Sequence, residues 1–202
     1  MIRFIPFVRR MRHDRRGTAI TEFALTAPMF LLLVMGIFDY SWQMYAQQVL
    51  QGAVGDASRL STLEGNATAD KQKLLDDAVR DKVKDVIGNA SLEFSRKAYQ
   101  DFSGVGQREA LEDSNNNGKA DKGECFDDMN GNNSWDNQDQ GRSGNGGASD
   151  VVLYTATAKI ERILPVWKIL GQSQQMTLTS STVLRNQPYA TVAATRKRVC
   201  VS

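Results

Sequence analysis

The sequence predicts an α+β protein in which a long N-terminal transmembrane helix continues into an exported domain with a small antiparallel sheet. Three observations lead to this prediction. An apolar run of helical length begins at Thr18, amphipathic helical periodicity continues beyond it, and segments rich in Val, Thr, Leu and Ile follow toward the C-terminus. Helices followed by strands are typical of α+β folds, so we expect the strands to pack against the first helix.

Residues 18–39 are the predicted transmembrane segment. The 21 residues from Thr18 to Phe38 form a helix of about 32 Å, which is enough to cross a hydrocarbon core of about 30 Å. The leader, residues 1–17, carries six arginines against one aspartate, and such an excess of positive charge stays in the cytoplasm. We therefore expect a single span in the inner membrane, with the N-terminus cytoplasmic and residues 40–202 periplasmic.

One carboxylate, Glu22, interrupts the apolar run. A charged side chain at the centre of a membrane helix costs roughly 2.5 to 3.5 kcal/mol on insertion scales, so a glutamate retained there is expected to have a partner and a function. Gly17 precedes it by five residues and follows the arginines. The segment from Gly17 to Phe23 therefore combines a basic flank, a small residue and a membrane carboxylate.

This arrangement resembles the processing site of the TadE-like pseudopilins of tight-adherence (Flp) pilus systems. The similarity continues through Phe23–Leu25 and Pro28 and returns near the C-terminus at Ser181–Asn186. The resemblance implies a pilin-like fold for residues 40–202 and a role in assembling type IVc-like pili. It also implies other pilins and pseudopilins as partners, together with a prepilin peptidase.

The same resemblance assigns roles to three residues. Cleavage would fall between Gly17 and Thr18, which would leave Glu22 at mature position five, paired with a terminal amine. Two other interpretations of the N-terminus stay open. A plain uncleaved anchor would leave Glu22 reaching toward the arginines. A cleaved secretory signal would need small residues after a shorter apolar core, where Phe38–Trp42 is bulky.

Composition narrows the possible functions of the exported part. Removing residues 1–16 takes away six arginines and one aspartate, which leaves 19 basic and 22 acidic side chains, a net charge of −3. No basic footprint for nucleic acid remains. The single histidine, His13, lies in the leader, so a histidine-dependent triad or zinc site cannot form outside. We expect no enzyme, and a carboxylate-pair enzyme is the remaining catalytic alternative.

The helical periodicity of the first segment continues past the membrane until Gly65–Asn66. We expect a second helix over about 69–87 and strands over 92–96, 151–160 and 176–184, with an apolar turn or short helix over 163–170. The residues of the first helix that we expect to contact the core are Trp42, Tyr45, Ala46, Val49, Leu50, Ala53, Val54, Ala57 and Leu60.

An insertion at about 109–147 contains a calcium-loop pattern. Oxygen-bearing side chains recur at positions 1, 3, 5, 9 and 12, glycine at position 6 permits a sharp turn, and position 7 supplies a carbonyl. The predicted ligands of this first loop are Asp113, Asn115, Asn117, Lys119, Asp121 and Glu124. A carbonyl is expected from Lys119, and both carboxylate oxygens from Glu124.

A second, looser copy of the pattern begins at Asp128. Its predicted ligands are Asp128, Asn130, Asn132, Ser134, Asp136 and Asp139, with a carbonyl expected from Ser134. Asn133 replaces the glycine, which asparagine's access to the left-handed region permits. Nine acids and two lysines lie between 109 and 139, so the segment carries a local charge of −7 that calcium would neutralise. An unordered polar insertion is the alternative.

Two cysteines, Cys125 and Cys200, lie in the exported part, where disulfides persist. We expect one disulfide that ties the insertion to the C-terminal end, with two buried free thiols as the alternative. The second candidate function for the whole chain is a membrane-anchored, calcium-dependent binding or adhesion module that is not processed. Cleavage after Gly17 is expected for the pseudopilin and not for the binding module, so N-terminal processing distinguishes the two functions.

Overall fold

The computed structural model describes residues 17–61, 69–186 and 197–201. Most of the arginine-rich leader, the predicted helix end at Gly65–Asn66 and residue 196 lie outside these residues. The chain divides into two compact units, one of residues 1–44 with 162–174 and one of residues 45–161 with 175–202. The prediction of an α+β fold with a long N-terminal helix and an antiparallel sheet is confirmed.

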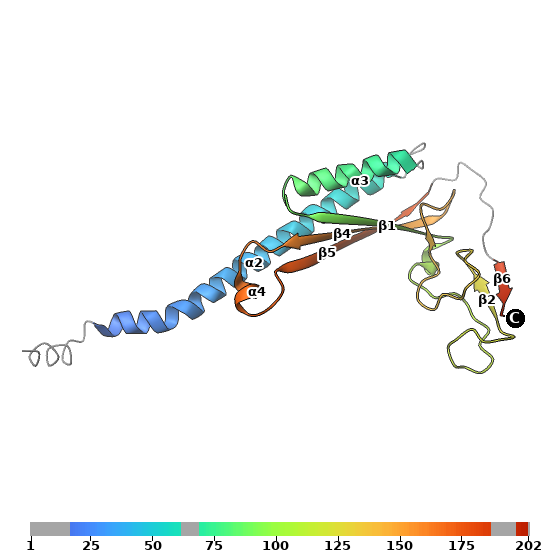
Figure 1. The fold of residues 1–202 in the computed structure, drawn as a ribbon. Coiled ribbons are helices and arrows are strands. Elements are labelled where there is room, and N and C mark those ends of the chain that lie inside the picture. The colour runs from blue at the N-terminus through green and yellow to red at the C-terminus, as the bar shows by residue number, and fades with distance from the viewer. Residues whose placement is uncertain (1–16, 62–68, 187–196, 202) are drawn as a thin grey trace, which may run out of the picture. The chain divides into compact units, whose positions relative to one another are not determined.

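Helix α2 (Thr18–Ser61) is continuous through both units and contains the whole predicted span (Figure 1). Its first half exposes large apolar side chains on every side. Those exposed by more than 70% are Ile20, Phe23, Leu25 and Met29. Within the described parts of the chain, α2 is the one helix long and apolar enough to cross a membrane.

The second half of α2 instead buries a narrow stripe. Its five buried apolar residues, each at most 6% exposed, are Ala46, Leu50, Ala53, Val54 and Ala57. Tyr45 and Leu60, which were also expected in the core, are 52% and 49% exposed. Tyr45 is rotated about 100° around the axis from Ala46, and Leu60 lies at the end of the described helix. The buried stripe is therefore narrower than predicted, because its central residues are buried as expected and Tyr45 and Leu60 are exposed.

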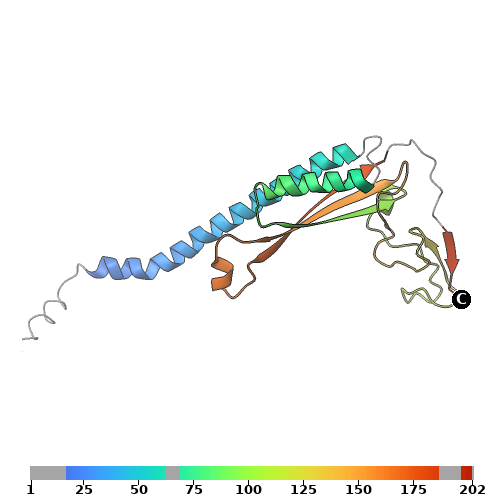
Figure 2. The ribbon, with the colours of Figure 1, turned by 45° about the horizontal axis from the view of Figure 1, so that its top comes forward.

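Four antiparallel strands form the main sheet in the order β3-β1-β4-β5. They are β1 (Ser91–Tyr99), β3 (Arg142–Ser143), β4 (Val151–Glu161) and β5 (Gln175–Arg185). Even-numbered residues of β4, from Val152 to Ile160, are buried. Figures 1 and 2 both show α3 (Ala69–Lys84) beside the later half of α2, with the long strands next to this helix pair. Ala156 and Ala158, both 0% exposed, leave room for close packing.

Three shorter elements complete the described chain. The 3-10 helix η2 (Phe102–Gly104) follows β1, and α4 (Val166–Ile169) lies in the connection between β4 and β5. A separate two-stranded sheet pairs β2 (Cys125–Asp128) with β6 (Lys197–Cys200). In this second sheet, β6 near the C-terminus lies beside β2 of the predicted calcium-loop segment.

A partly buried polar interaction joins α3 to the main sheet. Arg96 of β1 donates to both carboxylate oxygens of Asp76 in α3, over 2.6 and 2.9 Å, and the Tyr154 hydroxyl donates to the same carboxylate over 2.8 Å. The Arg96 guanidinium lies 4.5 Å from the centre of the Tyr154 ring. Burial, together with the neighbouring Asp76 carboxylate, raises the pKa of Tyr154. The hydroxyl therefore stays protonated and donates.

We predict that Asp76→Asn destabilises the protein by about 3 to 5 kcal/mol, because it leaves the Arg96 guanidinium partly buried without its charge partner. Glu93→Gln is the matched control, since the Glu93–Lys159 pair is 63% and 53% exposed and such surface pairs contribute at most about 1 kcal/mol. Urea unfolding measures both. Equal losses in the two variants would show that the Asp76 interaction does not hold α3 in place.

Candidate functional site

The two predicted calcium loops share a base of two short antiparallel segments, residues 109–113 and 124–128. Leu111 forms a bridge with Phe126. On either side of this bridge, Glu112 N–H donates to the Cys125 carbonyl and Asp127 N–H to the Ala110 carbonyl, each over 2.9 Å. Each residue of the first segment corresponds to the residue 15 positions later in the second. Under this correspondence, each of the two hydrogen bonds maps onto the other. The base therefore has an approximate two-fold relation.

The first loop folds around the carboxylates of its first and last residues. Asp113 Oδ2 accepts the N–H of Gly118 over 2.7 Å, and Glu124 accepts the N–H groups of Ser114 and Asp121, each over 2.9 Å. Gly118 has φ +72°, a conformation that glycine adopts without steric cost. Position 6 therefore has the left-handed conformation for which a glycine was predicted there.

The second loop repeats this arrangement. Asp128 Oδ2 accepts the N–H of Asn133 over 2.9 Å, and Asn133 has φ +57°. In both loops two asparagine amide groups donate to the carboxylate at position 9. Asn115 and Asn117 reach Asp121 over 2.9 and 2.6 Å, and Asn130 and Asn132 reach Asp136 over 2.6 and 2.8 Å. The replacement of glycine by asparagine therefore leaves the loop geometry unchanged.

The carboxylate that closes the second loop is Glu109. Its Oε1 accepts the N–H of Met129 over 2.7 Å, and its Oε2 accepts the N–H of Asp136 over 3.0 Å. These bonds match those that Glu124 makes in the first loop. Asp139, which was predicted for this position, lies elsewhere. Its carboxylate pairs with Lys97 and accepts the Tyr99 hydroxyl over 2.9 Å, so in this structure it does not take the position that Glu124 takes in the first loop.

The path of the chain explains the exchange. Residues 136–140 run alongside residues 107–109, since Glu109 N–H donates to the Asp136 carbonyl over 3.0 Å and Gln140 N–H to the Gln107 carbonyl over 2.8 Å. Because of this pairing, the Glu109 carboxylate reaches the N–H groups of Met129 and Asp136 in the second loop, whereas Asp139 lies beyond the loop. A comparison of the sequence with itself would have found Glu109, because residues 109–121 align with 124–136 at an offset of 15.

Burial dominates the electrostatics of the second loop. Burial raises the pKa of Glu109, and the nearby Asp136 and Asp128 carboxylates add to the effect, although the Met129 and Asp136 N–H groups oppose it. Glu109 and Asp128 are both 0% exposed. No lysine or arginine of the described chain forms an ion pair with either. In the first loop, hydrogen bonds from Asn115 and Asn117 lower the pKa of Asp121.

The donor chemistry of both loops fits a hard cation, because carboxylate and amide oxygens are the ligands that calcium prefers. In the residues that the structure describes, no group of three or more His, Cys, Asp or Glu side chains lies close enough together to hold a metal. Positions 3 and 5 of each loop are asparagines, and their NH₂ groups donate to the carboxylate at position 9. Cation binding would therefore need these amides to present their oxygens.

The disulfide predicted between Cys125 and Cys200 is present. These residues are directly opposed in the β2–β6 ladder. The ladder continues beyond them, since Val201 N–H donates to the Glu124 carbonyl over 2.9 Å and Gly123 N–H to the Val201 carbonyl over 2.8 Å. The C-terminal strand is therefore joined covalently and by hydrogen bonds to the end of the first loop.

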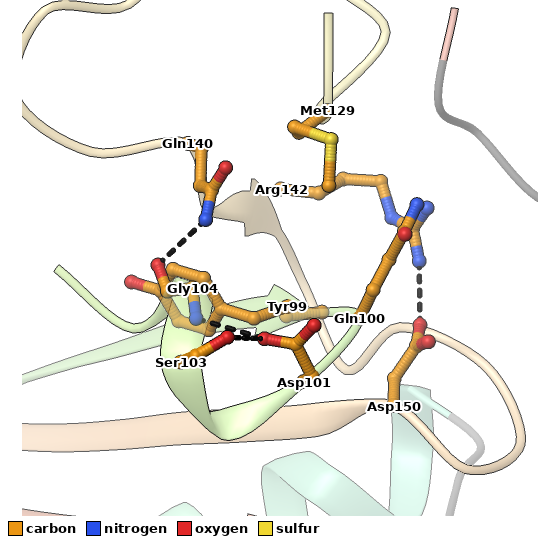
Figure 3. A pocket seen from close by; sticks show the side chains of 10 residues that line it. Tyr99, Gln100, Asp101, Ser103, Gly104, Met129, Gln140, Arg142 and Asp150 are labelled. Carbon is orange, nitrogen blue, oxygen red and sulfur yellow. Dashed lines mark hydrogen bonds and ion pairs between the residues drawn. The ribbon is translucent and has the colours of Figure 1, made fainter. Parts of the chain in front are cut away.

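A polar cavity of about 130 Å³ lies beside the loops (Figure 3). Its polar groups bind one another. Asp101 accepts from the Ser103 hydroxyl over 2.6 Å and from the Gly104 N–H over 2.9 Å, and Arg142 pairs with Asp150 over 2.7 Å. The polar groups of this cavity are therefore bonded to one another within its wall.

The predicted processing residues lie at the start of α2. Gly17 directly precedes the helix and Thr18 begins it. Glu22 lies on the exposed surface of the helix. Among the described residues, no side chain pairs with its carboxylate. The partner that the sequence predicts for this charge is therefore not found among the described residues.

These features define a protein with a single apolar N-terminal helix that continues into an α+β domain. Residues 17–59 match the model of the TadE-like protein family, which confirms the resemblance over this segment. The match includes Gly17 and Glu22 and ends before Ser181–Asn186. The match covers 43 of the 202 residues. Comparison with curated proteins and with solved structures gave no significant match.

The pKa of Glu109 should be above the ordinary value of 4.5, and that of Asp121 below 3.8. Because folded Glu109 keeps its proton to higher pH than the unfolded chain does, this residue lowers stability as pH rises from 4.5 through its raised pKa. Carboxyl NMR titration in chelator measures both pKa values. Titration of Glu109 at or below 4.5 would contradict the effect of burial.

Proposed function

We propose that this protein is a non-catalytic component of tight-adherence pilus assembly, acting as a TadE-like pseudopilin or minor pilin. In this proposal α2 anchors it in the inner membrane, with residues 40–202 in the periplasm. The observation that carries the proposal is the TadE-like match over residues 17–59, which covers Gly17, Glu22 and nearly all of α2. The arginines before Gly17 support a cytoplasmic N-terminus.

The mechanism is structural. A prepilin peptidase cleaves after Gly17, and the freed amine of Thr18, from the same or a neighbouring chain, pairs with Glu22. Support comes from the surroundings of Glu22, since a carboxylate on a lipid-facing helix is costly until a partner neutralises it. The exposed apolar side chains around it, such as Ile20 and Phe23, would pack against the helices of other pilins.

We predict that the mature protein from its native membrane begins at Thr18, and that replacing Gly17 with a bulky residue blocks this cleavage. Glu22→Ala and Glu22→Gln should both enter the membrane and fail to support filaments, because both lack the charge. Thr21→Ala is the matched control, since the Thr21 hydroxyl bonds only within its own helix turn, to the Thr18 carbonyl. Intact mass and filament counts are the measurements.

An unprocessed N-terminus with normal filaments would overturn the processing mechanism. If processing fails and filaments are unaffected by loss of the protein, the second function is favoured: a membrane-anchored, calcium-dependent binding or adhesion module. The observation in its favour is the repeated loop pair, which the TadE-like match does not include.

We also propose that the loop pair binds two calcium ions. The first site uses the predicted ligands of the first loop, from Asp113 to Glu124. The second uses Asp128, Asn130, Asn132, the Ser134 carbonyl and Asp136, with Glu109 in place of Asp139. Three observations support this proposal: the two loops share one pattern of hydrogen bonds, Glu109 and Asp128 are fully buried, and the segment carries a charge of −7. Bound cations would compensate these charges.

Calorimetry on the full-length protein in detergent should show two calcium-binding events with dissociation constants of about 10⁻⁴ to 10⁻³ M, as in extracellular modules. Glu124→Gln should remove one event and Glu109→Gln the other, each weakening its site at least about tenfold. Asp139→Asn is the matched control and should keep both events, because Asp139 bonds to Lys97 and Tyr99.

Calcium at one hundred times its dissociation constant should stabilise the protein by about 2.7 kcal/mol per site. Absence of any heat with the wild-type protein would reject the calcium proposal. Loss of an event in Asp139→Asn, with both retained in Glu109→Gln, would reject the assignment of Glu109 and restore that of Asp139.

A further inference from the structure

The connection between β4 and β5 exposes a cluster of large apolar side chains. Outside α2, eight such side chains are exposed in the described chain, and four of them lie within residues 163–170. They are Ile163 at 65%, Trp167 at 37%, Ile169 at 64% and Leu170 at 58% exposed. The other four are scattered singly. A cluster of this density marks an interaction surface, whereas single exposed residues need no explanation.

This connection is bound to α2 by a buried charge interaction. Residues 1–44 and 162–174 belong to the same compact unit. Asp39 of α2 is 4% exposed and forms an ion pair with Arg162. The same carboxylate oxygen accepts the Trp167 Nε1–H over 2.8 Å, and the Arg162 guanidinium lies 4.7 Å from the centre of the Trp167 ring. The exposed cluster therefore has a fixed position against α2.

Asp39 marks the end of the predicted span, since it is the first charged residue after Glu22. A helix from Thr18 to Phe38 crosses the hydrocarbon layer, so Asp39 lies at the membrane surface. Trp167, bonded to Asp39, then lies at the level where tryptophan is enriched in membrane proteins. Of the two basic residues in 162–174, Arg162 is neutralised by Asp39, and the exposed Lys168 is available to anionic phospholipid headgroups.

An apolar groove of about 440 Å³ lies between part of the connection and α2. Its walls include Val34, Phe38 and Trp42 of α2 and Ile163 and Leu164 of the connection. The groove faces the end of the apolar half of the helix, and its size and lining suit a hydrocarbon chain. Its position is continuous with the lipid-facing surface of α2.

We propose that residues 163–170 are a second membrane-contacting element, which docks into the phospholipid interface beside α2, with a lipid acyl chain in the groove. This inference rests on the membrane span in the proposed function. It adds that Asp39 and Arg162 fix the depth of α2, and hence the height of Gly17 and Glu22. A lone helix can slide and tilt, whereas a helix with a second attached contact cannot.

The test uses full-length protein in vesicles that contain phosphatidylglycerol and phosphatidylethanolamine. An environment-sensitive fluorophore is attached to Leu170→Cys, and in separate samples to Phe38→Cys and Asn89→Cys, with the native disulfide intact. Labels at positions 170 and 38 should be quenched by nitroxide lipids and protected from aqueous iodide. The label at exposed Asn89, in the other unit, should behave in the opposite way.

Arg162→Gln should raise iodide quenching at position 170 at least about threefold while the label at position 38 stays lipid-quenched, because the connection is released and α2 stays inserted. Lipid quenching at 38 with iodide quenching at 170 overturns this inference alone. Iodide quenching at both positions overturns the membrane span. Label–label quenching at 170 that grows with protein density, without lipid quenching, would assign the cluster to a second copy of the chain and also overturn the inference.

Discussion

The rest of the structure depends on one helix that has to satisfy two different surroundings. Apart from its ends and Pro28, which has no N–H, the backbone hydrogen bonds of α2 lie within the helix, so it can pass from lipid to a packed protein core without a break. The side chains of α2 differ between these two surroundings. Before Asp39 they are apolar on all sides, and from Ala46 to Ala57 they form one buried stripe. Asp39 itself is tolerated because Arg162 and Trp167 bind it.

Two carboxylates of α2, Glu22 and Asp39, illustrate opposite solutions to the cost of a charge in apolar surroundings. Asp39 finds its partners within the same chain, and the resulting contact holds the β4–β5 connection. Glu22 finds none among the described residues and stays exposed. In the proposed function this difference is the basis of assembly, because a charge left without an internal partner favours association with whatever can neutralise it.

Local patterns in the sequence predicted the helices and strands well, since burial along α2, β4 and β5 follows the ordinary periods. They failed where a partner lies far away in the chain. Asp76 looks like part of a solvated helix face, yet it bonds to Arg96 and Tyr154. The linear calcium-loop template likewise considers only residues downstream of Asp128, and so it selected Asp139, whereas the carboxylate that closes the second loop in the structure is Glu109.

The loop pair shows how a short segment can be ordered without a large apolar core. Carboxylates at both ends of each loop bind backbone N–H groups, the shared base pairs residues 109–113 with 124–128, and the Cys125–Cys200 disulfide holds β6 against it. Glu109 and Asp128 remain buried charges that hydrogen bonds satisfy but do not neutralise. In the calcium proposal, this is the physical reason to expect cations bound to the folded loops.

The division of α2 between two surroundings can be measured directly. A spin label moved along the helix from Ile20 to Leu60, in protein reconstituted into bilayers, reports its access to oxygen and to a water-soluble nickel complex. The account predicts oxygen access without periodicity through Ile37, and then low access to both reagents at Ala46, Leu50, Ala53 and Ala57 with a period of 3.6 residues. Access to the nickel complex throughout residues 20–37 would contradict it.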